Sequence, residues 1–476
     1  MKLIQNTFLA AILFTMIACQ NDSQLFLPAV FSDNLVLKQN TEVTIWGKAT
    51  PGSEVSVTGE WGASSSTSVR NDSTWQLDLS TSEAGGPYTV TVNNDGAQVK
   101  LNNVMLGEVW LASGQSNMEM PLEGWPPNDT IENSKQAIAE AENPNIRMFT
   151  VTREMSSEPE DDVDGSWKVS TPENARNFSA TAWFFAQKLN ARLNVPVGII
   201  HSSWGGTPIE AWISNPKLSR DDDFASATNA SESRPERSMT LSSETPTVLY
   251  NAMIAPLVPF NVNGTIWYQG ESNVGRAAQY RRLKQMLVED WRENFDHPDM
   301  PFYYVQIAPY NYDNPDGISS ALLRDAQRRS LDIPATGMAV TLDIGNIDNI
   351  HPGNKKDVGH RLARWTLARE HGKDIPYSGP LPAATEINDN QITIEFEHAD
   401  ELVLKEDVPN QFEIAGEDGQ FYPAKADIQG TSIVLSSPQV PNPANARYAF
   451  TNGASAALFN KAGLPASSFT TEAELE

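Results

Sequence analysis

The sequence predicts an α/β protein: a doubly wound parallel sheet flanked by N-terminal and C-terminal β-sandwich-like regions. Three observations lead to this fold class. Short strands of alternating polarity fill both ends of the chain. Nearly continuous apolar strands alternate with amphipathic helices between them. The chain has 476 residues, which is too long for one ordinary core, so two or three domains are expected.

The chain begins with a segment that has the features of an export signal. Lys2 is its only charge before an apolar run over residues 8–18, which is too short to span a bilayer. The letters MIAC resemble the lipobox of bacterial lipoproteins, in which the cysteine is acylated. Cys19 is also the only cysteine, so internal disulfides are excluded and a buried free thiol is the alternative. The pattern predicts a lipoprotein-type signal peptide over residues 1–19 and a bacterial lipoprotein anchored through Cys19, periplasmic or at the cell surface.

The next region, residues 25–103, is expected to be an N-terminal β-sandwich domain. The segments TEVTIWGKA, SEVSVTG and GPYTVTVNN alternate polar and apolar residues with a period of two. Gly, Pro, Ser and Asn separate them, and no helical period appears. Residues 373–476 have the same character in NQITIEFEH, TSIVLSS and ARYAFTNG, so a C-terminal β domain is expected there.

Residues 104–372 are expected to form the catalytic α/β domain. Helices are predicted over residues 278–294 and 354–372, the first because Tyr280, Leu283, Leu287 and Trp291 form one apolar stripe. Apolar strands that alternate with such helices favour a parallel sheet covered on both faces. The expected strands are residues 108–113, 195–203, 264–269, 301–308 and 337–344.

Polar and glycine-rich clusters follow four of these strands. In an open α/β sheet, functional residues gather at the carboxyl ends of the strands. Each cluster alone has a structural explanation, such as a turn, an Asx cap or a loop histidine. Four clusters at four strand ends instead favour a shared site. They contain Ser116 between Gln115 and Asn117, the pair Gly205 and Gly206, the block from Gln269 to Asn273, and Asp348 three residues before His351.

These residue types can together support nucleophilic catalysis. A serine hydroxyl is a weak nucleophile until a base removes its proton. Histidine suits that task because its pKa lies near neutrality, and a carboxylate fixes its tautomer. Backbone and amide donors stabilise the oxyanion of the tetrahedral intermediate. The alternative is that Ser116 occupies an ordinary surface turn.

The order of the clusters resembles that of the SGNH hydrolases. The blocks GEVWLASGQSNMEMPL, LYNAMIAPL, GTIWYQGESNVGRAAQYRRL, DIGNIDNIHPGNKKDVGHRLA and LPASSF are similar to the sialate O-acetylesterase family, and the likeness runs over about residues 26–469. The resemblance implies an SGNH-hydrolase-like sheet and a serine esterase that acts on O-acetylated carbohydrates. It implies no metal and no organic cofactor.

The resemblance also implies roles for individual residues. Ser116 is the expected nucleophile, His351 the base and Asp348 the third member of a triad. A Ser–His dyad is the alternative, with Glu271 and Asp343 as substitute carboxylates. The oxyanion hole is expected to use the Ser116 N–H, a glycine of the pair 205–206 and an amide of the third block. That block reads Gly-Glu-Ser where the SGNH pattern has Gly-X-Asn, so Gln269 or Asn273 would supply the amide.

Charge limits the partners. The chain carries 34 Lys and Arg against 60 Asp and Glu, a net charge of −26, so nucleic acid is not an expected partner and membrane contact is expected only through Cys19. Arg276 is a candidate for binding the carboxylate of a sialate. The alternative substrates are acetylated xylan or xyloglucan. A more distant alternative is a non-catalytic carbohydrate-binding surface protein.

Overall fold

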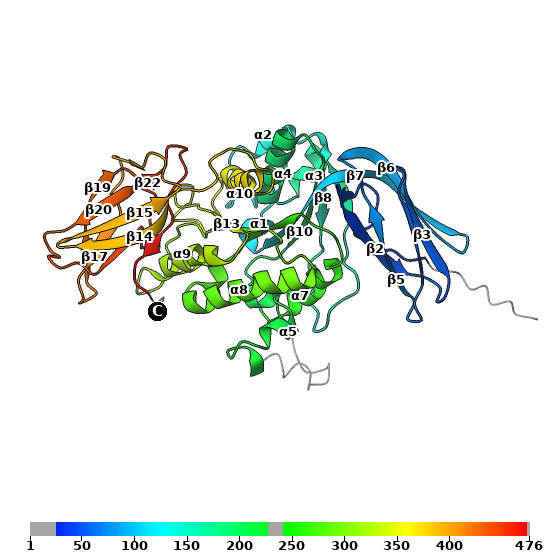
Figure 1. Cartoon of the computed structure of the whole chain (residues 1–476), viewed down its shortest axis with the longest axis horizontal. Coiled ribbons are helices and arrows are strands. Elements are labelled where there is room, and N and C mark those ends of the chain that lie inside the picture. The colour runs from blue at the N-terminus through cyan, green and yellow to red at the C-terminus, as the bar shows by residue number, and fades with distance from the viewer. Residues whose placement is uncertain (1–24, 227–240, 474–476) are drawn as a thin grey trace, which may run out of the picture.

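The computed structural model describes residues 25–226 and 241–473, and Cys19 therefore lies outside the described residues. Three regions follow one another along the long axis of the molecule: N-terminal strands at one end, an α/β region in the middle and C-terminal strands at the other end (Figure 1). Within the described ranges, no helix is long and apolar enough to cross a membrane.

The central sheet confirms the predicted α/β class. Its strands lie in the order β13-β12-β11-β7-β10-β8-β9, and every neighbouring pair is parallel except the edge pair β8–β9. The sequence pattern does not indicate β8 and β9, because β8 mixes Asn and Arg with its apolar residues and β9 has only four residues. The bounds are β7 Ala97–Gly114, β8 Asn143–Thr150, β9 Trp167–Ser170, β10 Val197–Ser203, β11 Gly264–Tyr268, β12 Phe302–Val305 and β13 Thr336–Ala339.

Helices cover both faces of this sheet, as the term doubly wound requires (Figure 1). Successive residues of β7 face opposite sides. Trp110 and Ala112 belong to one buried cluster with α4 (Ala180–Leu193) and α10 (Lys355–Arg369). Val109 and Leu111 belong to the other with α8 (Ala277–Asn294) and α9 (Ser319–Arg329). The two predicted helices are thus found as α8 and α10, whereas α4 and α9 were not predicted.

Short helices occupy the loops that connect these elements. The bounds are α1 Ser116–Glu119, α2 Ser134–Ala139, α3 Pro172–Arg176, η1 Ile209–Trp212, α5 Asn215–Leu218, α7 Val248–Met253, η2 Ala255–Leu257, η3 Glu271–Asn273 and η4 Ser330–Asp332. Two of them, α1 and η3, follow the carboxyl ends of β7 and β11 and contain residues of the predicted site.

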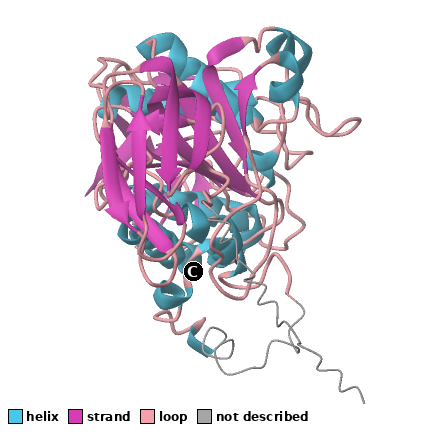
Figure 2. Cartoon of the chain, turned by 90° about the vertical axis from the view of Figure 1, so that its right-hand side faces the viewer, coloured by secondary structure: helices cyan, strands magenta, loops and turns pink. Residues whose placement is uncertain are grey.

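The N-terminal region is built from antiparallel strands, which Figure 2 turns toward the viewer. β2 pairs with β5, while β4, β3, β6 and β7 form a second sheet that β1 joins in parallel to β7. The strand β7 continues from this sheet into the central one, so the expected boundary at residue 103 falls inside a single strand. The bounds are β1 Val36–Lys38, β2 Glu42–Lys48, β3 Glu54–Gly59, β4 Ser64–Ser68, β5 Thr74–Ser80 and β6 Gly85–Asn94.

The C-terminal region contains two sheets with the orders β14-β15-β20-β19 and β18-β17-β21-β23, and a small pair β16-β22. Arg324 of α9 joins this region to the central one, because its buried guanidinium donates to Ser468 Oγ (2.9 Å) and to the Thr451 carbonyl. The bounds are β14 Leu381–Asn388, β15 Gln391–Glu397, β16 Val403–Leu404, β17 Phe412–Ala415, β18 Phe421–Pro423, β19 Lys425–Gln429, β20 Ser432–Ser436, β21 Asn445–Tyr448, β22 Leu458–Phe459 and β23 Phe469–Thr470.

Gly114 ends β7 and allows the chain to turn toward Ser116. Its φ is +139°, a conformation that side chains rarely adopt, and a Cβ at this position would lie 2.1 Å from the Tyr268 carbonyl oxygen. The next residue, Gln115, donates its backbone N–H to the same oxygen (2.9 Å). The glycine therefore lets β7 and β11 end in close contact immediately before Ser116.

Candidate active site

Ser116 is the first residue of α1, directly beyond the carboxyl end of β7. The side chains of the two neighbouring residues, Gln115 and Asn117, form hydrogen bonds to the segment that follows β11. The Gln115 side-chain oxygen accepts from the N–H groups of Gly270 (3.2 Å) and Ser272 (3.3 Å). The Asn117 side-chain amide donates to Glu271 Oε1 at 2.5 Å. Gln115 and Asn117 are almost completely buried, so these bonds are shielded from water and fix the backbone on both sides of the serine.

His351 lies against Ser116, as expected from the sequence. Its Nε2 is 2.9 Å from Ser116 Oγ. The histidine follows β13 and precedes α10, and its backbone N–H donates to Asn349 Oδ1 (2.8 Å). The Trp125 ring packs edge-on against the imidazole, with 5.3 Å between the ring centroids. A hydroxyl and a histidine that are 235 residues apart in sequence thus meet at one edge of the sheet.

The carboxylate beside His351 belongs to Asp129, and the prediction that Asp348 occupies this place is wrong. Asp129 Oδ2 lies 3.3 Å from His351 Nδ1, and Asp129 Oδ1 accepts from the Asn349 amide (2.8 Å). Asp348 is exposed, and its backbone N–H donates to Asn346 Oδ1. The turn of residues 346–350 is closed by its asparagine side chains, which leaves the Asp348 carboxylate on the outside.

The two substitute carboxylates also have other partners. Asp343 forms a two-pronged ion pair with the Arg361 guanidinium, with both distances at 2.6 Å. Glu271 is bound to Asn117. No sequence signal indicated Asp129, because it lies in the irregular segment PPNDT, far from the histidine in sequence.

The surroundings favour the neutral form of His351. Burial lowers the pKa of the imidazole, and the nearby Lys355 ammonium lowers it further, whereas Asp129 opposes both effects. A carboxylate at Nδ1 favours the tautomer with its proton on that nitrogen. The lone pair of Nε2 then faces the Ser116 hydroxyl, which is the arrangement that a general base requires.

The predicted oxyanion donors are only partly available. The Gly205 N–H already donates to Glu119 Oε2 (2.7 Å), although a Cβ on Gly205 would lie 3.2 Å from Ser116 Cβ. Within the described residues, the N–H groups of Ser116 and Gly206 donate no hydrogen bond. Gly206 has a φ of +76° and faces open space.

The side-chain amides of the block from Gln269 to Asn273 instead form hydrogen bonds to other groups of the protein. Gln269 donates to the Thr207 carbonyl (3.2 Å) and to Asn273 Oδ1 (2.6 Å). Asn273 donates to Glu210 Oε2 (3.0 Å), and its oxygen accepts from the Ile209 N–H (3.0 Å). Both side chains are fully buried. They hold η1 against the end of β11.

Two arginines lie near these elements, and both are paired. Arg276 donates to Glu210 Oε1 (2.8 Å) and to Gln279. Arg153, which no sequence pattern indicated, forms an ion pair with Glu119 of α1, and its guanidinium lies 5.7 Å from the Trp204 ring centroid. The Arg153 side chain is half exposed, so it can also contact a ligand.

Asn117 further links the serine to two buried charges. Its side-chain oxygen accepts from the Lys355 ammonium, and its amide donates to the Ile350 carbonyl (3.0 Å) as well as to Glu271. Burial lowers the pKa of Lys355 to about 7, against the opposing effects of Glu271 and Asp129. Burial raises the pKa of Glu271. One amide thus joins the serine turn, the end of β11 and the histidine loop.

A serine paired with a histidine at the carboxyl edge of a doubly wound sheet defines a serine hydrolase of the α/β class. Within the described ranges, no group of three or more His, Cys, Asp or Glu could hold a metal ion. Residues 106–368 match the family described as "Carbohydrate esterase, sialic acid-specific acetylesterase". The chain belongs to this family and is a carboxylic ester hydrolase.

Similar proteins support the same assignment. The chain is 32% identical over 453 residues to the sialate O-acetylesterase of Mus musculus, and this alignment covers 81% of each chain. It is 33% identical over 401 residues to the sialate O-acetylesterase of Homo sapiens, and this alignment covers 76% of this chain and 74% of the human protein. A crystal structure of a carbohydrate acetylesterase from Xanthomonas citri superimposes with a TM-score of 0.86 at 35% identity, over 95% of this chain and 100% of that one.

Replacing Asp129 by Asn tests which carboxylate supports His351. We expect Asp129→Asn to lower kcat by roughly 10²–10⁴-fold, because the amide no longer fixes the reactive tautomer. Asp348→Asn is the matched control and is expected to keep kcat within about twofold, since exposed substitutions usually have small effects. Hydrolysis of 4-nitrophenyl acetate measures both. A near-normal rate for Asp129→Asn would show that a Ser–His dyad suffices.

Replacing Lys355 by Met tests the electrostatic link to His351. Loss of the ammonium removes one cause of the low pKa of His351, so that pKa should rise. Because the base must be neutral, the acid limb of kcat/KM should move to higher pH. Loss of the bond to Asn117 should also lower kcat by roughly 5–30-fold, equivalent to about 1–2 kcal/mol. The exposed Lys356→Met is the control, and an acid limb identical in all three proteins would refute the link.

Proposed function

We propose that this protein is a serine esterase that removes O-acetyl groups from carbohydrates through an acetyl-Ser116 intermediate, with O-acetylated sialic acid as its substrate. The observation that carries the proposal is the 2.9 Å contact between Ser116 Oγ and His351 Nε2 in a chain of this esterase family. The names of the mouse and human relatives support the choice of sialate.

The geometry supports the following reaction. His351 Nε2 accepts the proton of Ser116 Oγ, and the oxygen attacks the acetyl carbonyl. Asp129 stabilises the imidazolium that forms, through Nδ1. His351 then gives the proton to the departing sugar oxygen. Water hydrolyses the acetyl-serine with His351 again acting as the base, and acetate leaves.

The N–H groups of Ser116 and Gly206 are the oxyanion donors in this proposal. Both lie beside the nucleophile, and neither has an acceptor within the described residues. Gly205 contributes by its close approach to Ser116, since its own N–H is bound to Glu119. Gln269 and Asn273 support the site indirectly, because Gln269 donates to the Thr207 carbonyl and Asn273 donates to Glu210 of η1.

A neutral acetylated sugar of xylan or xyloglucan is the second candidate substrate. One observation favours it. Arg153 and Arg276 are each paired with a carboxylate of the protein, Glu119 and Glu210, so a sialate carboxylate would have to share or displace these partners. Sharing is feasible because a guanidinium has five N–H donors. A purely carbohydrate-binding role would leave the Ser116–His351 contact without a use.

Acetate release from O-acetylated sialic acid and from acetylated xylan, measured side by side, tests the substrate. We expect preferential release from sialate. Ser116→Ala should reduce release by at least roughly 10³-fold without changing the circular dichroism spectrum, because the nucleophile is lost while the fold is kept. Preference for xylan would replace the sialate assignment. Release retained by a folded Ser116→Ala protein would refute the role of Ser116.

We also propose, from the sequence alone, that residues 1–19 form a signal peptide and that Cys19 carries a lipid anchor in the bacterial envelope. Expression in a bacterial host should place the protein in the membrane fraction. Cys19→Ala should move it to the soluble fraction, since acylation needs the thiol. Equal membrane association of the two proteins would contradict the anchor.

A further inference from the structure

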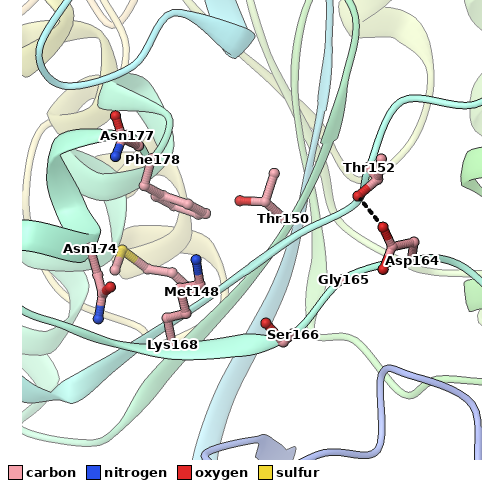
Figure 3. A pocket seen from close by; sticks show the side chains of 10 residues that line it. All are labelled: Met148, Thr150, Thr152, Asp164, Gly165, Ser166, Lys168, Asn174, Asn177 and Phe178. Carbon is pink, nitrogen blue, oxygen red and sulfur yellow. Dashed lines mark hydrogen bonds between the residues drawn. The ribbon is translucent and has the colours of Figure 1, made fainter.

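A pocket of about 540 Å³ lies between the sheet edge and the residues that follow α3 (Figure 3). Thr150 of β8 and Lys168 of β9 line the strand side, while Asn177 and Phe178 line the helix side. The pocket volume falls within the range of about 300–1,000 Å³ that is typical of small-ligand sites. None of the residues predicted from the sequence as part of the active site lines it.

The lining of the pocket is suited to a sugar. Among the described residues, the side chains of Thr150, Ser166, Lys168 and Asn177 make no hydrogen bond or ion pair, and all four are exposed. Together they offer hydroxyl, amide and ammonium groups to a ligand. Phe178 is buried and contributes an apolar wall. Sugar rings combine many hydroxyls with apolar C–H faces, and this lining complements both.

On two sides of the pocket, lining residues or their sequence neighbours bond to α1 or to the residues that follow it. Phe178 accepts the backbone N–H of Leu122 (2.8 Å), and the next residue, Ser179, donates its hydroxyl to the Met118 carbonyl (2.6 Å). On the other side, the lining residue Thr152 precedes Arg153, which is paired with Glu119. Met118 and Glu119 belong to the same short helix as Ser116.

The register of the sheet gives the approximate distance between the end of β8, beside the pocket, and the end of β7, beside Ser116. Residue Thr150 ends β8, and its register partner on β10 is His201, while Ser203 of β10 pairs with Gly114 of β7. The carboxyl ends of β8 and β7 are therefore separated by one strand. Neighbouring strands lie about 4.8 Å apart, and β7 extends two residues, about 7 Å, beyond the level of Thr150, so the two ends are roughly 12 Å apart, a span of about two sugar rings.

We propose that this pocket is a glycan subsite, which binds a neighbouring sugar of the same oligosaccharide whose acetyl ester lies at Ser116. The inference rests on the proposed function and adds the requirement for an extended glycan. The pocket supplies affinity for the chain beyond the acetylated sugar, and the chemistry remains with Ser116, His351 and Asp129.

The double variant Lys168→Ala/Asn177→Ala tests the subsite. Three substrates are compared: 4-nitrophenyl acetate, an O-acetylated monosaccharide, and an acetylated oligosaccharide of three or more sugars. We expect the variant to raise KM about tenfold for the oligosaccharide only, as loss of one or two good hydrogen bonds does. A small ester does not reach the pocket and should be unaffected. Lys100→Ala, in the N-terminal β region, is the control and should change none of the three.

Two further measurements separate this inference from the proposed function. Thr150→Trp fills the pocket instead of removing bonds, and it should weaken oligosaccharide turnover in the same selective way. In the Ser116→Ala background, calorimetric binding of the oligosaccharide should weaken when the pocket variants are added, whether or not the wild-type protein releases acetate. Unchanged binding and unchanged oligosaccharide KM would overturn the subsite. Equal losses on all three substrates would also overturn it, because they would indicate general damage.

Discussion

The side-chain amide of Asn117 is the interaction on which the site depends. It donates to Glu271 and to the Ile350 carbonyl and accepts from Lys355, so one buried group joins the ends of β7 and β11 to the histidine loop. An amide can do this because it carries two N–H donors and an acceptor oxygen in one rigid planar group. A carboxylate on one side and an ammonium on the other fix its orientation. Ser116 and His351 meet at 2.9 Å because the segments that carry them are held in this way.

Buried charge near the site acts on the imidazole as well as on the backbone. Burial and the Lys355 ammonium lower the pKa of His351, whereas Asp129 opposes them. The histidine is therefore neutral and able to accept a proton while its Nδ1 still faces a carboxylate. Glu271 and Lys355 also moderate each other, since each is buried and each favours the charged form of the other. The network thus combines positioning with control of protonation.

The parallel sheet places further polar groups beside the catalytic residues. The carboxyl ends of β7, β10 and β8 lie side by side, which places Ser116, the glycine pair and the polar pocket in one row. The acetyl group needs only the first two of these. An extended glycan would contact all three, and Arg153, which follows the lining residue Thr152 and pairs with Glu119 of α1, is a further group near this row. In such an arrangement the chemistry and the recognition of the glycan use different strands of one sheet, so each can vary without disturbing the other.

The α/β class, the strands that carry the site, and the pair Ser116 and His351 were all predicted from the amino-acid sequence. The class and the strands follow from local patterns of apolar strands, helical stripes and polar clusters at strand ends, whereas the roles of the pair came from the resemblance to a known family. Three features became visible only in the folded chain: Asp129 faces His351, the Gly205 N–H is bound to Glu119, and Arg153 lies beside α1. The strand β9 at the edge of the sheet and its neighbour β8 were also not indicated by the sequence, because β9 is short and β8 mixes polar with apolar residues. The physical reason is that hydrogen bonds and ion pairs of irregular loops depend on where distant segments meet. Such contacts between distant segments produce no periodicity or residue spacing in the sequence from which they could be predicted.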